Sequence, residues 1–66
     1  MTRIRALRKE RGMSISKLSQ VVEVNASVIS WVELGKLAAS PAVRTSLSKF
    51  YREKEKALFH GSGLAI

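Results

Sequence analysis

The segment ISKLSQVVEVNASVISWVEL, residues 15–34, decides the fold of this chain. In its first half, Leu18 and Val22 lie four residues apart, so both occupy one face of a helix. In its second half, Ile29 and Val32 lie three residues apart and do the same. The segment therefore predicts two short helices joined by a tight turn, and such a pair needs flanking helices to complete a core.

The residues of this segment also follow a known order of small, turn-forming, apolar, acidic and glycine positions. They are Ser19, Glu23, Val24, Ile29, Val32, Glu33 and Gly35, and LRKERGMS precedes them at residues 7–14. Over residues 4–41 the chain resembles the Cro/repressor (Xre-type) helix-turn-helix family. The resemblance implies an all-α, lambda-repressor-like domain of four to five helices that binds DNA.

Two residues depart from the usual pattern of that family. Glu23 stands at the turn, where the family usually has glycine, so a positive φ there would cost on the order of 1 kcal/mol. Ile15 stands at the start of the first motif helix, where the family often has glutamine. The sequence therefore lacks the side chain for one common DNA contact of the family.

Length and charge limit the classes of protein further. With 66 residues the chain can form one small domain, whose marginal core favours an oligomer contact. Twelve Lys and Arg against five acidic residues give a net charge of +7, which suits a polyanionic partner, although charge also serves solubility. No apolar run reaches the roughly 18 residues of a membrane span, and basic residues interrupt any stretch that resembles a signal peptide.

Helix-capping residues indicate where the helices begin, because a short polar side chain can accept a free N–H of the turn that follows. The capping residues are Thr2, Ser14, Asn25 and Ser40, and Pro41 suits a first helical position. The expected helices span residues 2–11, 15–22, 25–34 and 41 onward. The stretch REKEKALF at residues 52–59 forms a short fifth helix or extends the fourth.

The expected core collects the apolar residues that recur at helical spacing. They are Ile4, Leu7, Leu18, Val22, Val24, Ile29, Val32, Val43, Leu47 and Phe50. We therefore expect one domain over residues 1–59. The remaining residues 60–66 contain Gly61-Ser62-Gly63 and are expected to form a flexible tail.

The helix at residues 25–34 is the candidate reader of DNA. We place Ile29 at the centre of its buried side, and the residues that then face outward are Ser27, Trp31 and Leu34. This side has no Arg, Lys or Gln, so it offers hydroxyl, amide and methyl groups to base edges, and no bidentate arginine contact. The expected DNA-binding residues are Lys17, Asn25, Ala26, Ser27, Val28, Ser30, Trp31 and Lys36.

Two of these residues are lysines assigned to the DNA backbone. Lys17 stands in the first turn of a helix whose free N–H groups suit phosphate, although a merely solvated lysine is an equally good interpretation. Lys36 follows the reader helix, where the family resemblance implies a phosphate contact.

Trp31 has two interpretations. It packs on the sugar-phosphate backbone with its N–H donated to phosphate, or it folds over the surface of its own domain or of a partner subunit. Its apolar neighbours Val28 and Leu34 add an alternative function. On that reading the chain is a small protein-binding adaptor or anti-regulator that uses this apolar face.

The family resemblance implies further features. An arginine at the position of Arg8 pairs with the glutamate that ends the recognition helix, so Arg8 and Glu33 are expected to form a structural ion pair. The resemblance also implies a transcriptional repressor, in the cytoplasm of a bacterium or encoded by a phage, that binds a palindromic operator as a homodimer. We expect the dimer contact in the C-terminal region, through Tyr51, Leu58 and Phe59.

No constellation of residues for catalysis or metal binding is apparent. The five acidic residues form no convincing pair, and the chain has neither a glycine-rich phosphate loop nor a cysteine. The single histidine, His60, stands near the end of the sequence and is interpreted as a solvated residue. We therefore expect no enzyme, no cofactor and no metal.

Overall fold

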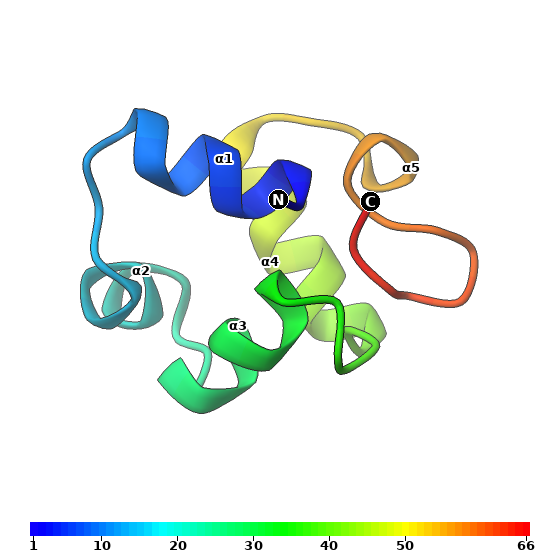
Figure 1. The fold of residues 1–66 in the computed structure, drawn as a ribbon, viewed down its shortest axis with the longest axis horizontal. Coiled ribbons are helices and arrows are strands. Elements are labelled where there is room, and N and C mark those ends of the chain that lie inside the picture. Colours follow the sequence, from blue (N-terminus) through cyan, green and yellow to red (C-terminus); the bar gives the residue numbers. More distant parts are fainter.

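Five α-helices and one isolated β-bridge make up the computed structural model, which describes all 66 residues. The helices are α1 (Arg3–Glu10), α2 (Ile15–Val22), α3 (Ala26–Glu33), α4 (Pro41–Tyr51) and α5 (Glu55–Leu58). Figure 1 shows α1 along the top, α2 at the left, α3 below, and α5 with the C-terminal segment at the right. The all-α fold predicted from the sequence, with a helix-turn-helix at α2 and α3, is confirmed.

Side-chain caps set the beginnings of three helices. Ser14 Oγ accepts a hydrogen bond from the Lys17 N–H at 3.0 Å. Asn25 Oδ1 accepts one from the Ser27 N–H at 2.8 Å, and Ser40 caps α4 in the same way. These bonds satisfy N–H groups that an α-helix leaves without a carbonyl partner, so local sequence determines where α2, α3 and α4 start.

The turn between α2 and α3 contains a left-handed residue. Glu23 ends α2 with φ 56° and ψ 43°, a conformation in which glycine is usual. A residue with a side chain costs on the order of 1 kcal/mol there. Ser19 offsets part of that cost, because its Oγ donates to the Val24 carbonyl at 2.6 Å and its carbonyl accepts from the Val24 N–H at 3.2 Å. The serine thus ties the end of the turn back to α2.

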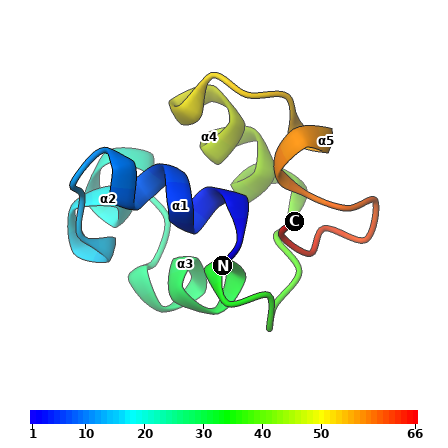
Figure 2. The same ribbon diagram turned by 45° about the horizontal axis from the view of Figure 1, so that its top comes forward.

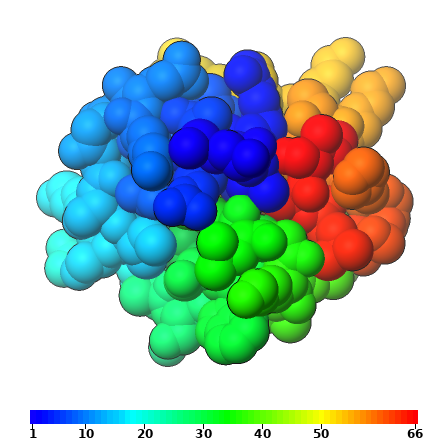
Figure 3. Space-filling view, viewed as in Figure 1, coloured from blue at the N-terminus to red at the C-terminus, as the bar shows by residue number.

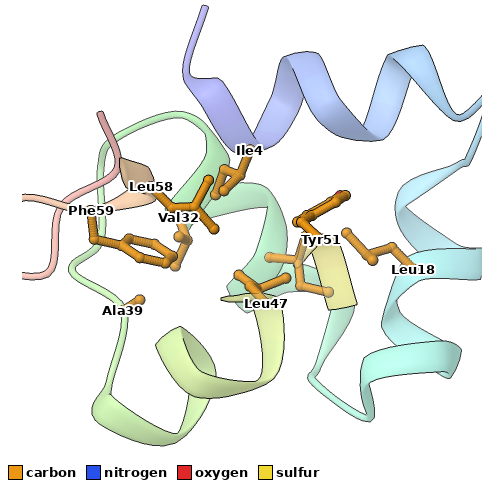
Figure 4. Packing of buried hydrophobic residues seen from close by; sticks show 9 residues of the cluster. Ile4, Leu18, Val32, Ala39, Leu47, Tyr51, Leu58 and Phe59 are labelled. Carbon is orange, nitrogen blue, oxygen red and sulfur yellow. The ribbon is translucent and has the colours of Figure 1, made fainter. Parts of the chain in front are cut away.

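The core lies between the five helices (Figure 4). Nine apolar side chains are buried in it: Ile4, Leu18, Ile29, Val32, Ala39, Leu47, Tyr51, Leu58 and Phe59. The other residues expected in the core are partly buried and pack against this cluster: Leu7, Val22, Val24, Val43 and Phe50. The helical periodicity of the sequence therefore predicted the buried side of each of the first four helices.

The last apolar residues of the chain complete this core. Tyr51, Leu58 and Phe59 are only 4%, 0% and 3% exposed. Figure 4 shows Leu58 beside Val32, with Phe59 from the same segment next to Ala39. The expectation that Tyr51, Leu58 and Phe59 form a dimer contact is therefore wrong. The physical reason is size, because a chain of 66 residues has too few helices to cover its core without the last one.

The segment at residues 60–66 packs against the domain. After α5 the chain turns at Gly63, which is buried and has a φ of 93°, a value that favours glycine. The chain then returns along itself, so that Phe59 and Ala65 form an antiparallel bridge. The His60 N–H donates to the carbonyl of residue 64 at 2.8 Å within this turn.

Three backbone hydrogen bonds attach the returning segment to other parts of the molecule. The Ile66 N–H donates to the Leu58 carbonyl at 2.9 Å, and the Ala39 N–H donates to the Gly63 carbonyl at 2.9 Å. The Arg3 N–H, at the start of α1, donates to the Ile66 carbonyl at 2.7 Å. Figure 2 shows the C-terminus beside the connection between α3 and α4. The expected flexible tail is thus corrected, because its backbone groups find partners despite its glycine-rich composition.

Candidate nucleic-acid interface

A buried ion pair holds the C-terminal end of α3 against α1. Arg8 Nε donates to Glu33 Oε2 at 2.8 Å and Arg8 Nη2 donates to Glu33 Oε1 at 3.1 Å, a bidentate arrangement. The two side chains are 10% and 2% exposed. Arg8 Nη1 also donates to the Met13 carbonyl at 2.7 Å. The expected pair is therefore present, and one arginine links α1, α3 and the approach to α2.

Thr2 forms a second link to the same end of α3. The sequence predicts Thr2 as the cap of α1, but its side chain accepts no capping hydrogen bond there. Thr2 Oγ1 instead donates to the Glu33 carbonyl at 2.7 Å. The last carbonyls of a helix have no partner within the helix, so Thr2 satisfies the end of α3 in place of the start of α1.

The outward face of α3 is largely apolar. Trp31 and Leu34 are 53% and 50% exposed, and Ser27 is exposed beside them. The flanking positions, which are half-buried, are Ala26, Val28 and Ser30. The residues at the sides of this face therefore show only part of their surface to a ligand, whereas Trp31 projects from it.

Lys36 lies close to Trp31, in the connection that follows α3. Its Nζ is 5.9 Å from the centroid of the indole ring, at the outer limit of a cation–π contact. About half of the Trp31 surface remains accessible beside this lysine. An apolar ring and a cation are therefore presented together at the end of α3.

The starts of α2 and α3 present further polar groups. Asn25 uses its Oδ1 to cap α3, so its side-chain NH2 group is the part left to donate to a ligand. Lys17 is exposed in the first turn of α2. The first N–H groups of each helix have no intrahelical acceptor and lie at the positive end of the helix dipole, which suits phosphate oxygens.

A depression of about 150 Å³ lies between α1, the start of α2 and the end of α3. The residues that line it are Arg5, Arg8, Ile15, Ser30, Glu33 and Leu34. Arg5 was not among the expected DNA-binding residues, yet its Nε is buried here without a hydrogen-bond partner. The signal that could have identified it is its spacing of three residues from Arg8, which places both on one side of α1.

The structure brings the expected DNA-binding residues together on one motif. α2 and α3 pack against each other, so Lys17 and the residues of α3 belong to neighbouring helices. Asn25 caps α3, and Lys36 follows three residues after its last residue. One arginine that the sequence reasoning missed, Arg5, lies at the edge of this group.

Three features of the whole molecule bear on other kinds of site. No helix is both long and apolar enough to cross a membrane. No group of three or more acidic or imidazole side chains is placed to hold a metal ion. The larger of the two surface depressions measures about 210 Å³, below the roughly 300–1,000 Å³ of pockets for drug-sized ligands.

Most of the chain matches a known protein family. A family model described as a helix-turn-helix domain matches residues 2–58, which include all five helices. No curated protein and no solved structure matches the sequence.

Proposed function

Since the chain belongs to the helix-turn-helix domain family, we propose that it is a sequence-specific DNA-binding transcriptional regulator of the Cro/repressor type. In this proposal α3 enters the major groove and the protein acts as a repressor on bacterial or phage DNA, in the bacterial cytoplasm. The observation that carries the proposal is the fixed orientation of α3, whose inner side is buried and whose outer side is free.

The dimensions of α3 suit the major groove. An α-helix with its side chains is about 10–12 Å in diameter. The major groove of B-DNA is about 12 Å wide and admits one helix. Because Arg8 and Thr2 both hold the carboxyl end of α3, the helix would enter the groove as a rigid body with the rest of the domain.

The chemistry of the outward face sets what α3 would read. The hydroxyl groups of Ser27 and Ser30 can donate to or accept from base edges, and Ala26 and Val28 can contact thymine methyl groups. No side chain on this face can form the bidentate contact of arginine with guanine. We therefore expect modest discrimination per half-site, with a preference for A·T-containing positions at the methyl contacts.

The basic residues would hold the backbone of the duplex. Lys17 is exposed in the first turn of α2, Lys36 is exposed in the connection after α3, and the whole chain carries a net charge of +7. Each phosphate neutralised by a lysine releases condensed counterions, so affinity should fall steeply with salt. Phosphate contacts of this kind position the protein and carry no sequence information.

Two variants separate backbone contacts from base reading. Lys36→Gln should weaken binding to all sequences alike and reduce the slope of log affinity against log salt by about one unit. Ser27→Ala should instead alter the preferred sequence with little change in that slope. Lys49→Gln, an exposed lysine near the end of α4, is the matched control for lost charge. Affinities at several salt concentrations measure the slope for all three variants, and selection from a random duplex library measures their sequence preference. The absence of any enriched site for wild type rules out sequence-specific recognition.

We further propose that the protein binds a palindromic operator as a homodimer. One reader helix without long polar side chains discriminates poorly, and two-fold pairing doubles the recognised site. Half-sites would then lie about 34 Å apart, one turn of the duplex. Tyr51, Leu58 and Phe59 are no longer candidates for the contact, because they are buried within the protomer. Sedimentation with and without DNA tests the dimer, and a monomer on an asymmetric site contradicts it.

A protein-binding adaptor is the second candidate function. The observation in its favour is that Trp31 and Leu34 are each about half exposed on one face, beside Val28, without charge of their own. One fluorescence-anisotropy titration against genomic DNA fragments separates the two functions. Selective binding by wild type supports the regulator. If wild type shows no binding to DNA at protein concentrations below about 10 μM in ~0.1 M salt, its affinity is weaker than that of the tighter nonspecific DNA-binding proteins, and the adaptor is favoured.

A further inference from the structure

A second depression lies outside the helix-turn-helix, between the first turn of α4, α5 and the loop that follows α5. We call it the basic depression, and it measures about 210 Å³. The residues that line it are Arg44, Glu55, Lys56, Phe59, His60 and Gly61. Three of these six residues have side chains with nitrogen donors, and only one has a carboxylate.

Arg44 is held in place at the wall of the basic depression. Its Nη1 donates to the Ala39 carbonyl at 2.6 Å. Gly63 packs so closely that a Cβ added there would lie 2.6 Å from Arg44 Nη1. The remaining guanidinium N–H groups form no ion pair, because the two ion pairs of the structure are made by other arginines. Arg44 is therefore a cation in a fixed position, and its other guanidinium N–H groups are available to bind a ligand.

The charge lining the depression is positive. Glu55 accepts a hydrogen bond from Thr45 Oγ1 at 3.2 Å and forms no ion pair with Arg44, Lys56 or His60. Two permanent cations thus face one carboxylate, and the imidazole of His60 adds another donor. Neither Lys56 nor His60 has a side-chain hydrogen bond elsewhere, so both are free to turn toward a ligand.

We propose that the basic depression binds a phosphate group. Arginine and lysine form charge-assisted hydrogen bonds with phosphate oxygens, and Arg44 supplies the fixed member of the set. A volume of about 210 Å³ exceeds the roughly 30 Å³ of one water molecule several times, yet falls short of a pocket for a drug-sized ligand. The depression therefore fits one phosphate group with its water shell and excludes a whole buried nucleotide.

Two sources can supply this phosphate group. The loop that carries His60 is bonded to the connection between α3 and α4 through the Ala39 N–H and the Gly63 carbonyl, 2.9 Å apart. The same connection carries Lys36. Figure 3 shows the C-terminal segment, in red, directly beside the green part of the chain that contains this connection. A backbone phosphate of bound DNA beyond the end of α3 is one source. Free inorganic phosphate or a small phosphate monoester is the other, and only the first rests on the proposed function.

The variants are chosen to leave the fold intact. Arg44 is left unchanged, because its bond to the Ala39 carbonyl supports the C-terminal segment. The double variant Lys56→Gln/His60→Gln removes two exposed side chains that make no hydrogen bond. Lys54→Gln is the matched control, since Lys54 is exposed in the same stretch of chain but does not line the depression. The ¹H–¹⁵N spectra of all variants verify that they fold.

The first arm titrates inorganic phosphate at constant pH and ionic strength, with chloride as the reference anion. The expected result is a saturable shift of the amide resonances of Lys56, His60 and Gly61. The apparent affinity should fall about tenfold or more in the double variant and stay unchanged in Lys54→Gln. That result assigns the site to a free phosphate group.

The second arm measures the salt dependence of binding to DNA. If a backbone phosphate occupies the basic depression, the double variant lowers the slope of log affinity against log salt by about one to two units relative to Lys54→Gln. Equal slopes for the double variant and the control, together with no saturable phosphate shift, overturn the inference.

The two arms also separate this inference from the proposed function. A wild-type protein that binds no DNA but saturates with phosphate contradicts the proposed function and supports the site. A protein that selects a DNA sequence, with no effect of the double variant in either arm, leaves the proposed function standing and contradicts the site.

Discussion

Removing one partner of the buried pair Arg8–Glu33 should destabilise the domain far more than removing both. Glu33→Ala leaves the guanidinium of Arg8, which is 8% exposed, without the carboxylate that accepts its Nε and Nη2 hydrogens. Breaking a buried pair in this way costs about 3–5 kcal/mol. At about 0.05–0.15 kcal/mol per residue, a chain of 66 residues has a total stability of roughly 3–10 kcal/mol. The single variant should therefore lose a large part of the free energy of unfolding.

The double variant Arg8→Met/Glu33→Leu should recover most of that loss. Replacing both charges by apolar groups of similar size removes the desolvation cost together with the attraction. The remaining penalty falls on the Met13 carbonyl, which loses its 2.7 Å bond from Arg8 Nη1 and costs about 1–3 kcal/mol if it stays unpaired. We expect the double variant to lie within about 2 kcal/mol of wild type.

Urea unfolding followed by far-UV circular dichroism measures each corner of this cycle. The matched control is Arg3–Glu53, an ion pair of 3.0 Å whose side chains are 50% and 32% exposed. Its cycle should give a coupling energy of only about 0–1 kcal/mol, because water screens a surface pair. If Glu33→Ala lost less than about 1 kcal/mol, as a surface pair would, the argument from burial would be refuted.

Three further predictions concern the core, the turn and a buried phenol. Ile29→Ala should cost about 2–4 kcal/mol in urea unfolding, because a fully buried side chain is lost and a cavity remains; an unchanged unfolding curve would contradict the burial of Ile29. Glu23→Gly should stabilise the protein by about 0.5–1 kcal/mol, because glycine adopts the positive φ of this position without strain. Glu23→Ala keeps the strain and should not stabilise the protein. Equal effects of the two variants would assign the gain to the lost charge. Burial, followed by the charge of Glu33, raises the pKa of Tyr51 from 10.0 to about 12, with two nearby arginines acting in the opposite direction. Since the folded state holds the phenolic proton more tightly than the unfolded chain, this contribution to stability is present below pH 10 and is lost between pH 10 and about 12. Tyr51→Phe should reduce the alkaline loss of stability over that range, and an identical pH profile would contradict it.

Local chemistry accounts for the parts of the structure that the sequence predicted. Ser14, Asn25 and Ser40 each satisfy an N–H within three residues, so the starts of α2, α3 and α4 depend on a few neighbours only. The outward position of Trp31 followed from helical periodicity once Ile29 was placed inward. The sequence placed the turn at Glu23 and gave the cost of a positive φ there, and the structure shows that this residue is left-handed and that the Ser19 hydroxyl supports the turn.

Long-range contacts account for the parts that the sequence did not predict. Threonine is a residue type that often caps helices, but the Thr2 hydroxyl donates to the Glu33 carbonyl, 31 positions away in the chain. Arginine side chains are mostly exposed to solvent, yet Arg5 Nε is buried beside α3. In both cases the neighbouring residues belong to α3, and their position relative to α1 depends on how the helices pack.

The sequence by itself determined where α2, α3 and α4 begin and which sides of the first four helices are buried, because caps and apolar spacing act within a few residues. The end of α4 and the separate α5 stayed open. Only the tertiary structure decided the role of the C-terminal residues. Leu58 and Phe59 are equally apolar whether they cover their own core or a partner, and the packing shows that they cover their own. The glycines of residues 60–66 permit a flexible tail or a tight return, and the return is stable here because the backbone groups of Arg3, Ala39 and Leu58 are in position to bond it.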